Sequence, residues 1–179
     1  MEIINRSFTI SEFKSYVASL SFANWKPSFV VRHSTGLPTL AMRPDGLSHQ
    51  HLINIADGYE RNNGWHVGPH LFVDDFHINV FSSLQKPGIN SPSWNSESFG
   101  VEQLGNYNFE NYDSGRGLKV QLNAIAAIAI LSHAVGIDSH SMKDHLEDPK
   151  TTHKDCPGSL CHSGKNKFMD DVHNYMLTL

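Results

Sequence analysis

The sequence predicts a mixed α/β fold, in which a central mixed β-sheet is flanked by helices. Two observations support this prediction. Short apolar runs with strand character alternate along the chain with longer segments whose apolar residues recur at helical spacing. No internal repeat, low-complexity segment or long linker interrupts the alternation. Elements that alternate in this way bury their apolar faces most economically as a sheet with helices packed on it.

The amino-terminal segment, 1–26, is predicted to be a helical extension packed on the rest of the domain. Thr9 and Glu12 have the spacing of a capping box, in which a hydroxyl and a carboxylate satisfy the free N–H groups at a helix start. The next element is an apolar run at 29–31, which predicts a buried strand that ends near His33.

The remaining elements are predicted in the same way, helices from apolar residues at helical spacing and strands from short apolar runs. In chain order we predict a helix at 48–61, hairpin strands at 70–75 and 76–81, a loop at 87–92, a strand at 99–104, a buried helix at 119–135 and a last helix from about 164. Gly136 is positioned to end the buried helix, and Ser163 to cap the last one.

Length and composition indicate one domain covering the whole chain, 1–179. A chain of 179 residues can enclose a substantial core without disulfides, and a hydrophobic content of 39% suits a soluble globular protein. The formal net charge of −4 offers no basic surface, so nucleic acid is not an expected partner. Nothing in the pattern suggests an obligate partner chain, and we expect a monomer.

The sequence also bears on localisation. The first residues carry charges where a signal peptide needs an apolar core of about 7–15 residues. The longest apolar run, 124–131, is shorter than the span of about 18–20 residues that crosses a membrane. We therefore expect synthesis in the cytoplasm without a signal peptide, and no membrane insertion.

The segment from His145 to Gly158 contains a histidine, a lysine and a cysteine beside a Pro-Gly turn. With His33, it offers two imidazoles and one thiolate, which make a three-ligand set for Zn²⁺ with the fourth tetrahedral position open. Structural zinc sites usually fill all four positions, whereas catalytic sites keep one free. The pattern therefore predicts a zinc enzyme.

A competing interpretation is a closed structural zinc site made from His153, Cys156, Cys161 and His162, which would not need His33. Short clusters of this kind usually hold together small domains that lack a core, and this chain is long enough to have one. We therefore favour the open site. Two cysteines are too few for a disulfide framework.

Four segments resemble the type-2 N-acetylmuramoyl-L-alanine amidases, the zinc amidase family shared by phage endolysins, wall-recycling amidases and peptidoglycan recognition proteins. The resemblance covers about 27–176. The segments are WHVGPHLFVDD at 65–75, PGINSPSWN at 87–95, FGVEQLGNY at 99–107 and TTHKDCPG at 151–158.

The resemblance implies a role for each matching residue. His33, His145 and Cys156 match the zinc ligands of the family. Glu102 matches the general base of the wall-recycling branch, and Lys154 matches the lysine that polarises the scissile carbonyl. The implied reaction is hydrolysis of the amide between the lactyl group of N-acetylmuramic acid and the L-alanine of the stem peptide.

These roles agree with the chemistry of amide hydrolysis. Zn²⁺ lowers the pKa of a bound water from about 15.7 towards about 7. Glu102 would accept a proton from that water and pass it to the leaving amine. Lys154 and the metal would face the negative charge of the tetrahedral intermediate.

Substrate contacts are expected from His70, Asn90 and Trp94. The chain departs from the family pattern in three places. The segment between His145 and Cys156 is a few residues longer than in the shortest relatives, which leaves His153 nearer to Cys156 than His145 is. Pro69 stands where the phage lysozyme branch has a tyrosine, so Glu102 would carry the base role alone. Asn90 stands where many relatives have a histidine.

Within the family, the close resemblance is to phage and prophage endolysins that consist of the catalytic domain alone. Such an enzyme would degrade cell-wall peptidoglycan after holin-type release into the periplasm. Two alternatives remain open: a wall-recycling amidase that acts on anhydro-muropeptides, and a non-catalytic peptidoglycan-binding module. Binding modules commonly replace the cysteine ligand, and because Cys156 is present the sequence favours an enzyme.

Overall fold

A single six-stranded sheet organises the protein, as seen in a computed structural model that describes all 179 residues. Its strand order is β1-β4-β3-β5-β2-β6. The strands are β1 (Arg6–Phe8), β2 (Phe29–Ser34), β3 (Leu71–Val73), β4 (Ile78–Val80), β5 (Ser98–Gln103) and β6 (Lys143–Asp144). β3, β5, β2 and β6 run parallel, whereas β4 and β1 are antiparallel to their neighbours. The sheet is therefore mixed, as predicted.

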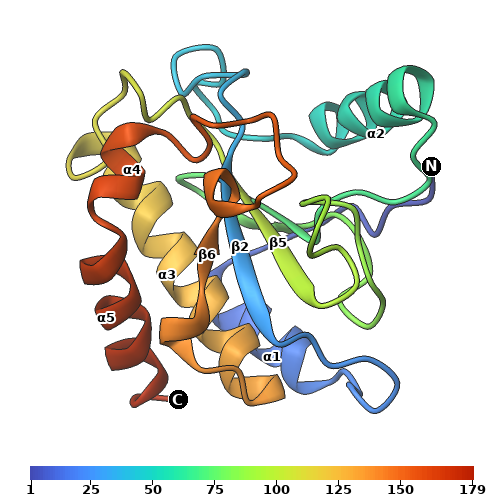
Figure 1. Cartoon of the computed structure of the whole chain (residues 1–179), viewed down its shortest axis with the longest axis vertical. Coiled ribbons are helices and arrows are strands. Elements are labelled where there is room, and N and C mark those ends of the chain that lie inside the picture. The colour runs from blue at the N-terminus through green and yellow to red at the C-terminus, as the bar shows by residue number, and fades with distance from the viewer.

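The helices occupy two regions around this sheet. They are α1 (Ile10–Ala18), α2 (His49–Asn63), α3 (Gly115–Val135), α4 (Ser159–Ser163) and α5 (Lys165–Met176), with two short 3₁₀ helices, η1 (Ser139–Ser141) and η2 (His145–Glu147). α3 packs against both α1 and α5 behind the sheet, whereas α2 stands away from them, at the opposite end of the molecule from α1 (Figure 1).

α3 is the central core helix that the sequence predicts. By length and hydropathy alone it could cross a membrane, but most of its apolar window is buried inside the protein. Val120, Ala124 and Ile128 are almost completely buried in the main hydrophobic cluster, which accounts for the apolar character of the helix. Gly136 ends it in a left-handed conformation, with φ of 78°.

Several predicted elements are confirmed, and the ends of others differ. The Thr9–Glu12 capping box is present at the start of α1. Ser163 does not cap α5: it is the last residue of α4, and α5 begins at Lys165 after Gly164, which provides no side-chain cap. The segment 1–26 is more than a helical extension, because β1 pairs with β4 at the edge of the sheet.

The pairing of β2 with β5 positions the candidate site. The two strands are parallel and in a register that places His33 beside Glu102. β6 joins the other edge of β2 and pairs Arg32 with Asp144, the residue before His145. Because the carboxyl ends of parallel strands meet at one edge of a sheet, three residues from distant parts of the chain converge there.

Candidate metal centre and active-site cleft

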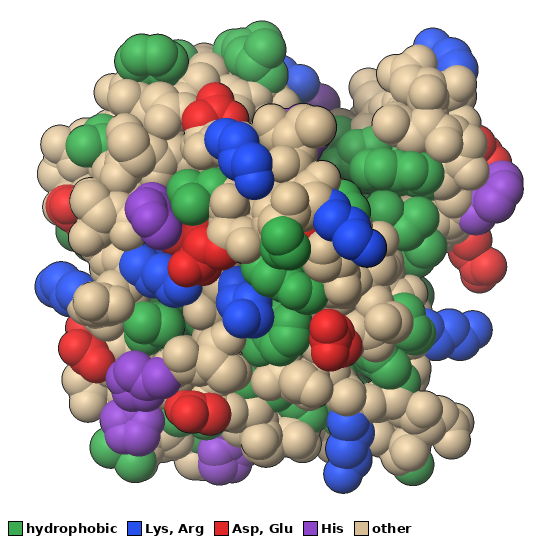
Figure 2. Space-filling view, in the orientation of Figure 1, with side chains coloured by type: hydrophobic (Ala, Val, Ile, Leu, Met, Phe, Trp, Pro, Cys, Tyr) green, Lys and Arg blue, Asp and Glu red, His purple; other side chains and the backbone are tan.

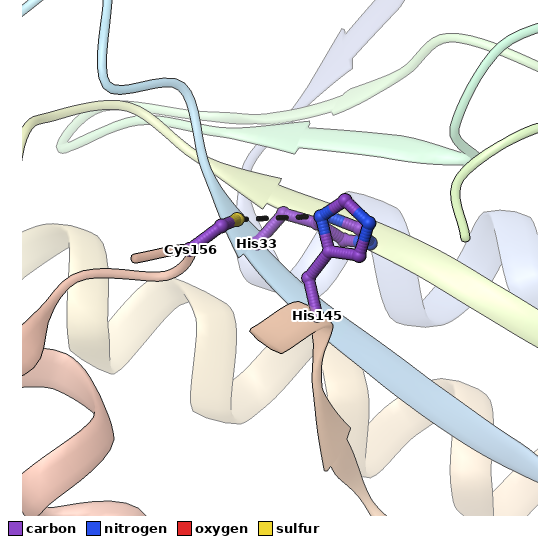
Figure 3. Close-up of side chains that lie close together, drawn as sticks. All are labelled: His33, His145 and Cys156. Carbon is purple, nitrogen blue, oxygen red and sulfur yellow. Dashed lines mark hydrogen bonds between the residues drawn. The ribbon is translucent and has the colours of Figure 1, made fainter. Parts of the chain in front are cut away.

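Three potential metal ligands converge at this edge of the sheet. His33 lies near the end of β2, His145 opens η2 directly after β6, and Cys156 lies in the loop before α4 (Figure 3). One ligand atom from each residue lies within 4.8 Å of the other two. Both histidines are buried and Cys156 is partly exposed. The structure therefore assembles the ligand set that the sequence predicts.

The spacing of these atoms suits zinc. The Cys156 Sγ lies 3.8 Å from the His33 Nδ1. Two ligands at zinc–sulfur and zinc–nitrogen bond lengths in a tetrahedron would be about 3.5 Å apart. The His33 and His145 ring centroids are 4.4 Å apart. A nitrogen, nitrogen and sulfur set of this size fits a zinc ion with small adjustments of the side chains.

Hydrogen bonds and burial prepare the two imidazoles for a metal. Asn90 Oδ1 lies 3.4 Å from His33 Nε2, and Thr151 Oγ1 lies 2.9 Å from His145 Nε2. Partners of this kind fix the orientation of a ligand ring and leave the other nitrogen free. Burial lowers the pKa of His33 to about 3 and that of His145 to about 4, so both rings are neutral at pH 7, as a ligand must be.

The Cys156 thiol is held in its protonated form by its surroundings. Burial, and then the nearby Glu102, raise its pKa well above the usual value. A bound cation that replaced the thiol proton would neutralise the thiolate and so offset the cost of burying its charge, because metal binding and proton release are coupled. The donor set is therefore suited to a cation.

Glu102 lies next to the candidate ligands, and its carboxylate accepts no hydrogen bond within the protein. Its Oε1 is 3.8 Å from the His33 Nδ1, and its side chain is 15% exposed. Burial raises the pKa of Glu102 to about 8. Carboxylates with raised pKa values in clefts are suited to acid–base chemistry near neutral pH.

These residues lie in a cleft of about 650 Å³ between α2 and the carboxyl edge of the sheet. In the space-filling view, α2 is separated from the main body by a recess, and hydrophobic side chains gather on the flank that faces the body (Figure 2). Tyr59 and Trp65 line one side, Thr35 and Leu37 the other, and no lysine or arginine is among the lining residues. The cleft is large enough for part of a glycopeptide.

Of the three predicted substrate contacts, Asn90 alone lines the cleft. His70 is completely buried, with its Nδ1 accepting from the Gly100 N–H and its Nε2 donating to the Lys86 carbonyl oxygen. Its ring also stacks on Trp25 at a centroid distance of 5.3 Å. Both nitrogens are therefore used in holding β3, β5 and a loop together, and the substrate contact expected for His70 stays a prediction that would require these bonds to open.

Trp94 also lies outside the cleft. Its ring packs edge-on against Phe29 at a centroid distance of 5.7 Å, and the Lys143 Nζ lies 5.1 Å from the same ring. These contacts place Trp94 over the starts of β2 and β6, the ends opposite the candidate ligands. Trp94 thus packs over this end of the sheet, and the substrate contact expected for it stays a prediction.

Lys154 is exposed, and its Nζ donates to the Asp148 carbonyl oxygen at 3.2 Å. It is not among the residues that line the cleft. The polarising role implied for Lys154 therefore remains a prediction that would require its side chain to leave this contact.

Asp148 is a supporting residue that the sequence argument missed. Its completely buried carboxylate accepts hydrogen bonds from the Ser91 hydroxyl and from the Ser93 N–H and hydroxyl. Burial alone would raise the pKa of Asp148, but these bonds outweigh it and hold the pKa well below the usual range. Asp148 thus fastens the loop before β5 to the segment between His145 and Cys156.

The competing four-residue zinc site does not form. His162 Nδ1 pairs with the Asp144 carboxylate at 2.6 Å, and Cys161 is buried in the core, where it contacts the Gln103 amide. Both cysteines are free thiols. The structure therefore leaves Cys156 to the His33 and His145 set.

A buried ion pair connects the strands that carry the two histidines. Arg32 donates to both carboxylate oxygens of Asp144 at 2.8 and 3.1 Å, and both side chains are completely buried. The Arg32 guanidinium also lies over the Phe168 ring at 4.5 Å. Because Arg32 and Asp144 directly precede His33 and His145, this pair sets how the two ligands approach each other.

We expect Asp144→Asn to lower the free energy of unfolding by about 3–5 kcal/mol, because it leaves the Arg32 charge buried without its partner. Urea denaturation measures this loss. Asp171→Asn is the matched control, since it breaks the exposed Lys167–Asp171 pair and should cost less than about 1 kcal/mol. Equal losses in the two variants would contradict the role assigned to the Arg32–Asp144 pair.

No family model matches the chain, and no curated protein matches its sequence. Solved structures do match. The N-acetylmuramoyl-L-alanine amidase endolysin LysCS from Clostridium intestinale has a TM-score of 0.62 and 20% identity over 85% of this chain and 92% of its own. Drosophila PGRP-LB has a TM-score of 0.63 and 18% identity over 80% and 84%. The catalytic domain of XlyA has a TM-score of 0.59 and 20% identity over 83% and 88%.

The chain therefore has the mixed α/β fold that these amidases and PGRP-LB share. The predicted fold is confirmed by this similarity. At identities near 20%, the agreement concerns the fold, and the chemistry has to be argued from the residues of this chain.

Proposed function

We propose that this protein is a zinc-dependent N-acetylmuramoyl-L-alanine amidase, with the whole chain, 1–179, as one catalytic domain. The observation that carries the proposal is the convergence of His33, His145 and Cys156 on a cleft that also contains the carboxylate of Glu102, 3.8 Å from the His33 ring. Three ligands with an open fourth position are the arrangement of catalytic zinc sites. The fold, shared with N-acetylmuramoyl-L-alanine amidases, supports the same conclusion.

The bond to be cut joins the lactyl carbonyl of N-acetylmuramic acid to the amine of L-alanine. A zinc ion held by the three ligands would supply Lewis acidity, which makes water a better nucleophile and polarises a carbonyl. Glu102 accepts the proton released as water attacks the carbonyl carbon. When the carbon–nitrogen bond breaks, Glu102 returns that proton to the departing amine, and its carboxylate is regenerated.

Peptidoglycan is the proposed substrate and partner. A variant of Drosophila PGRP-LB with this fold was solved in complex with tracheal cytotoxin, a peptidoglycan fragment. The cleft of this chain is open and lined by neutral polar side chains, including Asn62, Asn106 and Asn108, which suits hydroxyl and amide groups of a glycopeptide. We further propose that the protein acts as a monomeric endolysin of phage or prophage origin on the cell wall.

The test is digestion of purified peptidoglycan by the zinc-loaded protein, with and without a chelator, and with mass spectrometry of the soluble products. We expect stem peptides with a free amino-terminal L-alanine, formed only when zinc is present. Activity should return when zinc is added back to the chelated protein. Retention on the wall without released peptides would instead indicate a binding module, and cleavage of soluble anhydro-muropeptides alone would indicate a recycling enzyme.

A further inference from the structure

Tyr59 lies on the face of α2 that forms one wall of the cleft. Leu52 and Ala56 are the buried residues of this helix. Ile55, Tyr59 and Asn62, spaced by four and three residues, line the cleft. Residues with this spacing share one face of a helix, so α2 presents a distinct side to the cleft and Tyr59 is at its middle.

The Tyr59 ring is held in place by its neighbours. It packs against Trp65 at a centroid distance of 5.2 Å and edge-on against Phe81 at 6.2 Å. Gly68 leaves room for this packing, because a Cβ added there would lie 2.7 Å from the Phe81 ring and 3.3 Å from the Tyr59 ring. The hydroxyl, by contrast, makes no hydrogen bond within the chain and remains available to a molecule in the cleft.

Tyr59 lines the same cleft as Glu102 and the three candidate ligands, so its phenol faces the space in which the reaction would take place. Burial raises the pKa of Tyr59 far above its usual value, and the nearby Glu102 and Cys156 raise it further. The phenol therefore keeps its proton over the whole neutral range and can act as a hydrogen-bond donor. The cleft has no lysine or arginine lining it, and the Lys154 ammonium is bonded to the Asp148 carbonyl oxygen.

We propose that Tyr59 is a catalytic residue, whose hydroxyl donates a hydrogen bond to the oxygen of the scissile carbonyl as negative charge develops on it. This inference rests on the amidase function proposed above. The proton stays on the phenol, and the oxyanion loses the hydrogen bond again when the carbon–nitrogen bond breaks. A donor aimed at the developing charge stabilises the transition state more than the bound substrate.

Tyr59→Phe tests the proposal, because it removes one oxygen that has no partner in the protein. The probe is a soluble muropeptide that contains the lactyl–L-alanine amide. We expect kcat to fall by about 10²–10³ with KM changed by less than about threefold, as for the loss of a transition-state hydrogen bond. Zinc content and melting temperature should match those of the wild type. Tyr175→Phe, on α5 and outside the cleft, is the matched control and should leave kcat unchanged.

The outcomes separate this proposal from the proposed function. If the wild-type protein is inactive on the muropeptide, both the proposed amidase function and the catalytic role of Tyr59 are rejected. If the wild type is active and Tyr59→Phe has the wild-type kcat, or raises KM alone, the role of Tyr59 is overturned and the amidase function stands. Rates are measured at a temperature where circular dichroism shows every variant to be folded, so that a less stable variant still gives a decisive kcat.

Discussion

Cys156→Ser is expected to abolish zinc binding and amidase activity together while the fold is retained. A serine hydroxyl does not ionise near neutral pH and is not among the usual zinc ligands, so two histidines alone would remain. After dialysis, elemental analysis should find zinc in the wild type and almost none in the variant. Because Cys156 is only partly buried, we expect the free energy of unfolding without metal to change by less than about 1 kcal/mol.

The matched control for this variant is Cys161→Ala. Cys161 is five residues further along the chain, but it is completely buried and its Sγ contacts the Gln103 amide at 3.7 Å. We expect this change to reduce stability modestly and to leave zinc content and turnover unchanged. Loss of zinc on changing Cys161, with zinc kept on changing Cys156, would contradict the assigned ligand set.

Several residues that the structure brings together at the candidate site have local signals in the sequence. His33 and Glu102 belong to short apolar strands, and parallel strands end at one edge of a sheet, where their polar residues meet. Cys156 is marked by the Pro-Gly turn that follows it. Local patterns thus predicted the strands and pointed to the candidate ligands, and the paired register brings these residues together in the structure.

The contacts that the sequence did not indicate are those that a side chain makes with partners distant in the chain. His70 was expected at the substrate, but Gly100 and Lys86, far along the chain, use both of its nitrogens. The place of Tyr59 in the cleft could not be read from the sequence either. Helical spacing shows that Tyr59 and Ala56 belong to one amphipathic helix, but which of its sides meets a cleft depends on how the helix sits beside the sheet.

Two of the short strands, β1 and β6, were missed for a related reason. β1 and β6 are too short for alternation of apolar and polar residues to be recognised, and they form because β4 and β2 offer free edges. Yet β6 matters for the site, since its pairing with β2 brings His145 to His33. The motif around Cys156 could point to the ligands, but the element that positions His145 is visible only in the structure.

Glu102→Gln should keep zinc and lose most of the turnover. Glutamine has nearly the same shape, but its amide cannot accept the proton of the attacking water. General-base catalysis typically contributes about 10²–10⁴ in rate, so we expect kcat to fall by that factor. Glu97→Gln is the matched control, because Glu97 is exposed and lies outside the cleft. A Glu102→Gln variant that turns over at close to the wild-type rate, with full zinc content, would show that another group is the base.

The pH dependence of kcat in the wild type and in Glu102→Gln tests the general-base role of Glu102 independently. Only the carboxylate form accepts a proton, so the wild-type rate should rise with pH until Glu102 is ionised. Burial raises the pKa of Glu102 to about 8. A bound dication acts in the opposite direction, since a nearby positive charge favours the carboxylate. The midpoint of the rise in the zinc-loaded enzyme should therefore lie below that value, and it should vanish in Glu102→Gln. If the rise persists in the variant, it reports the ionisation of a different group, and Glu102 is not the base.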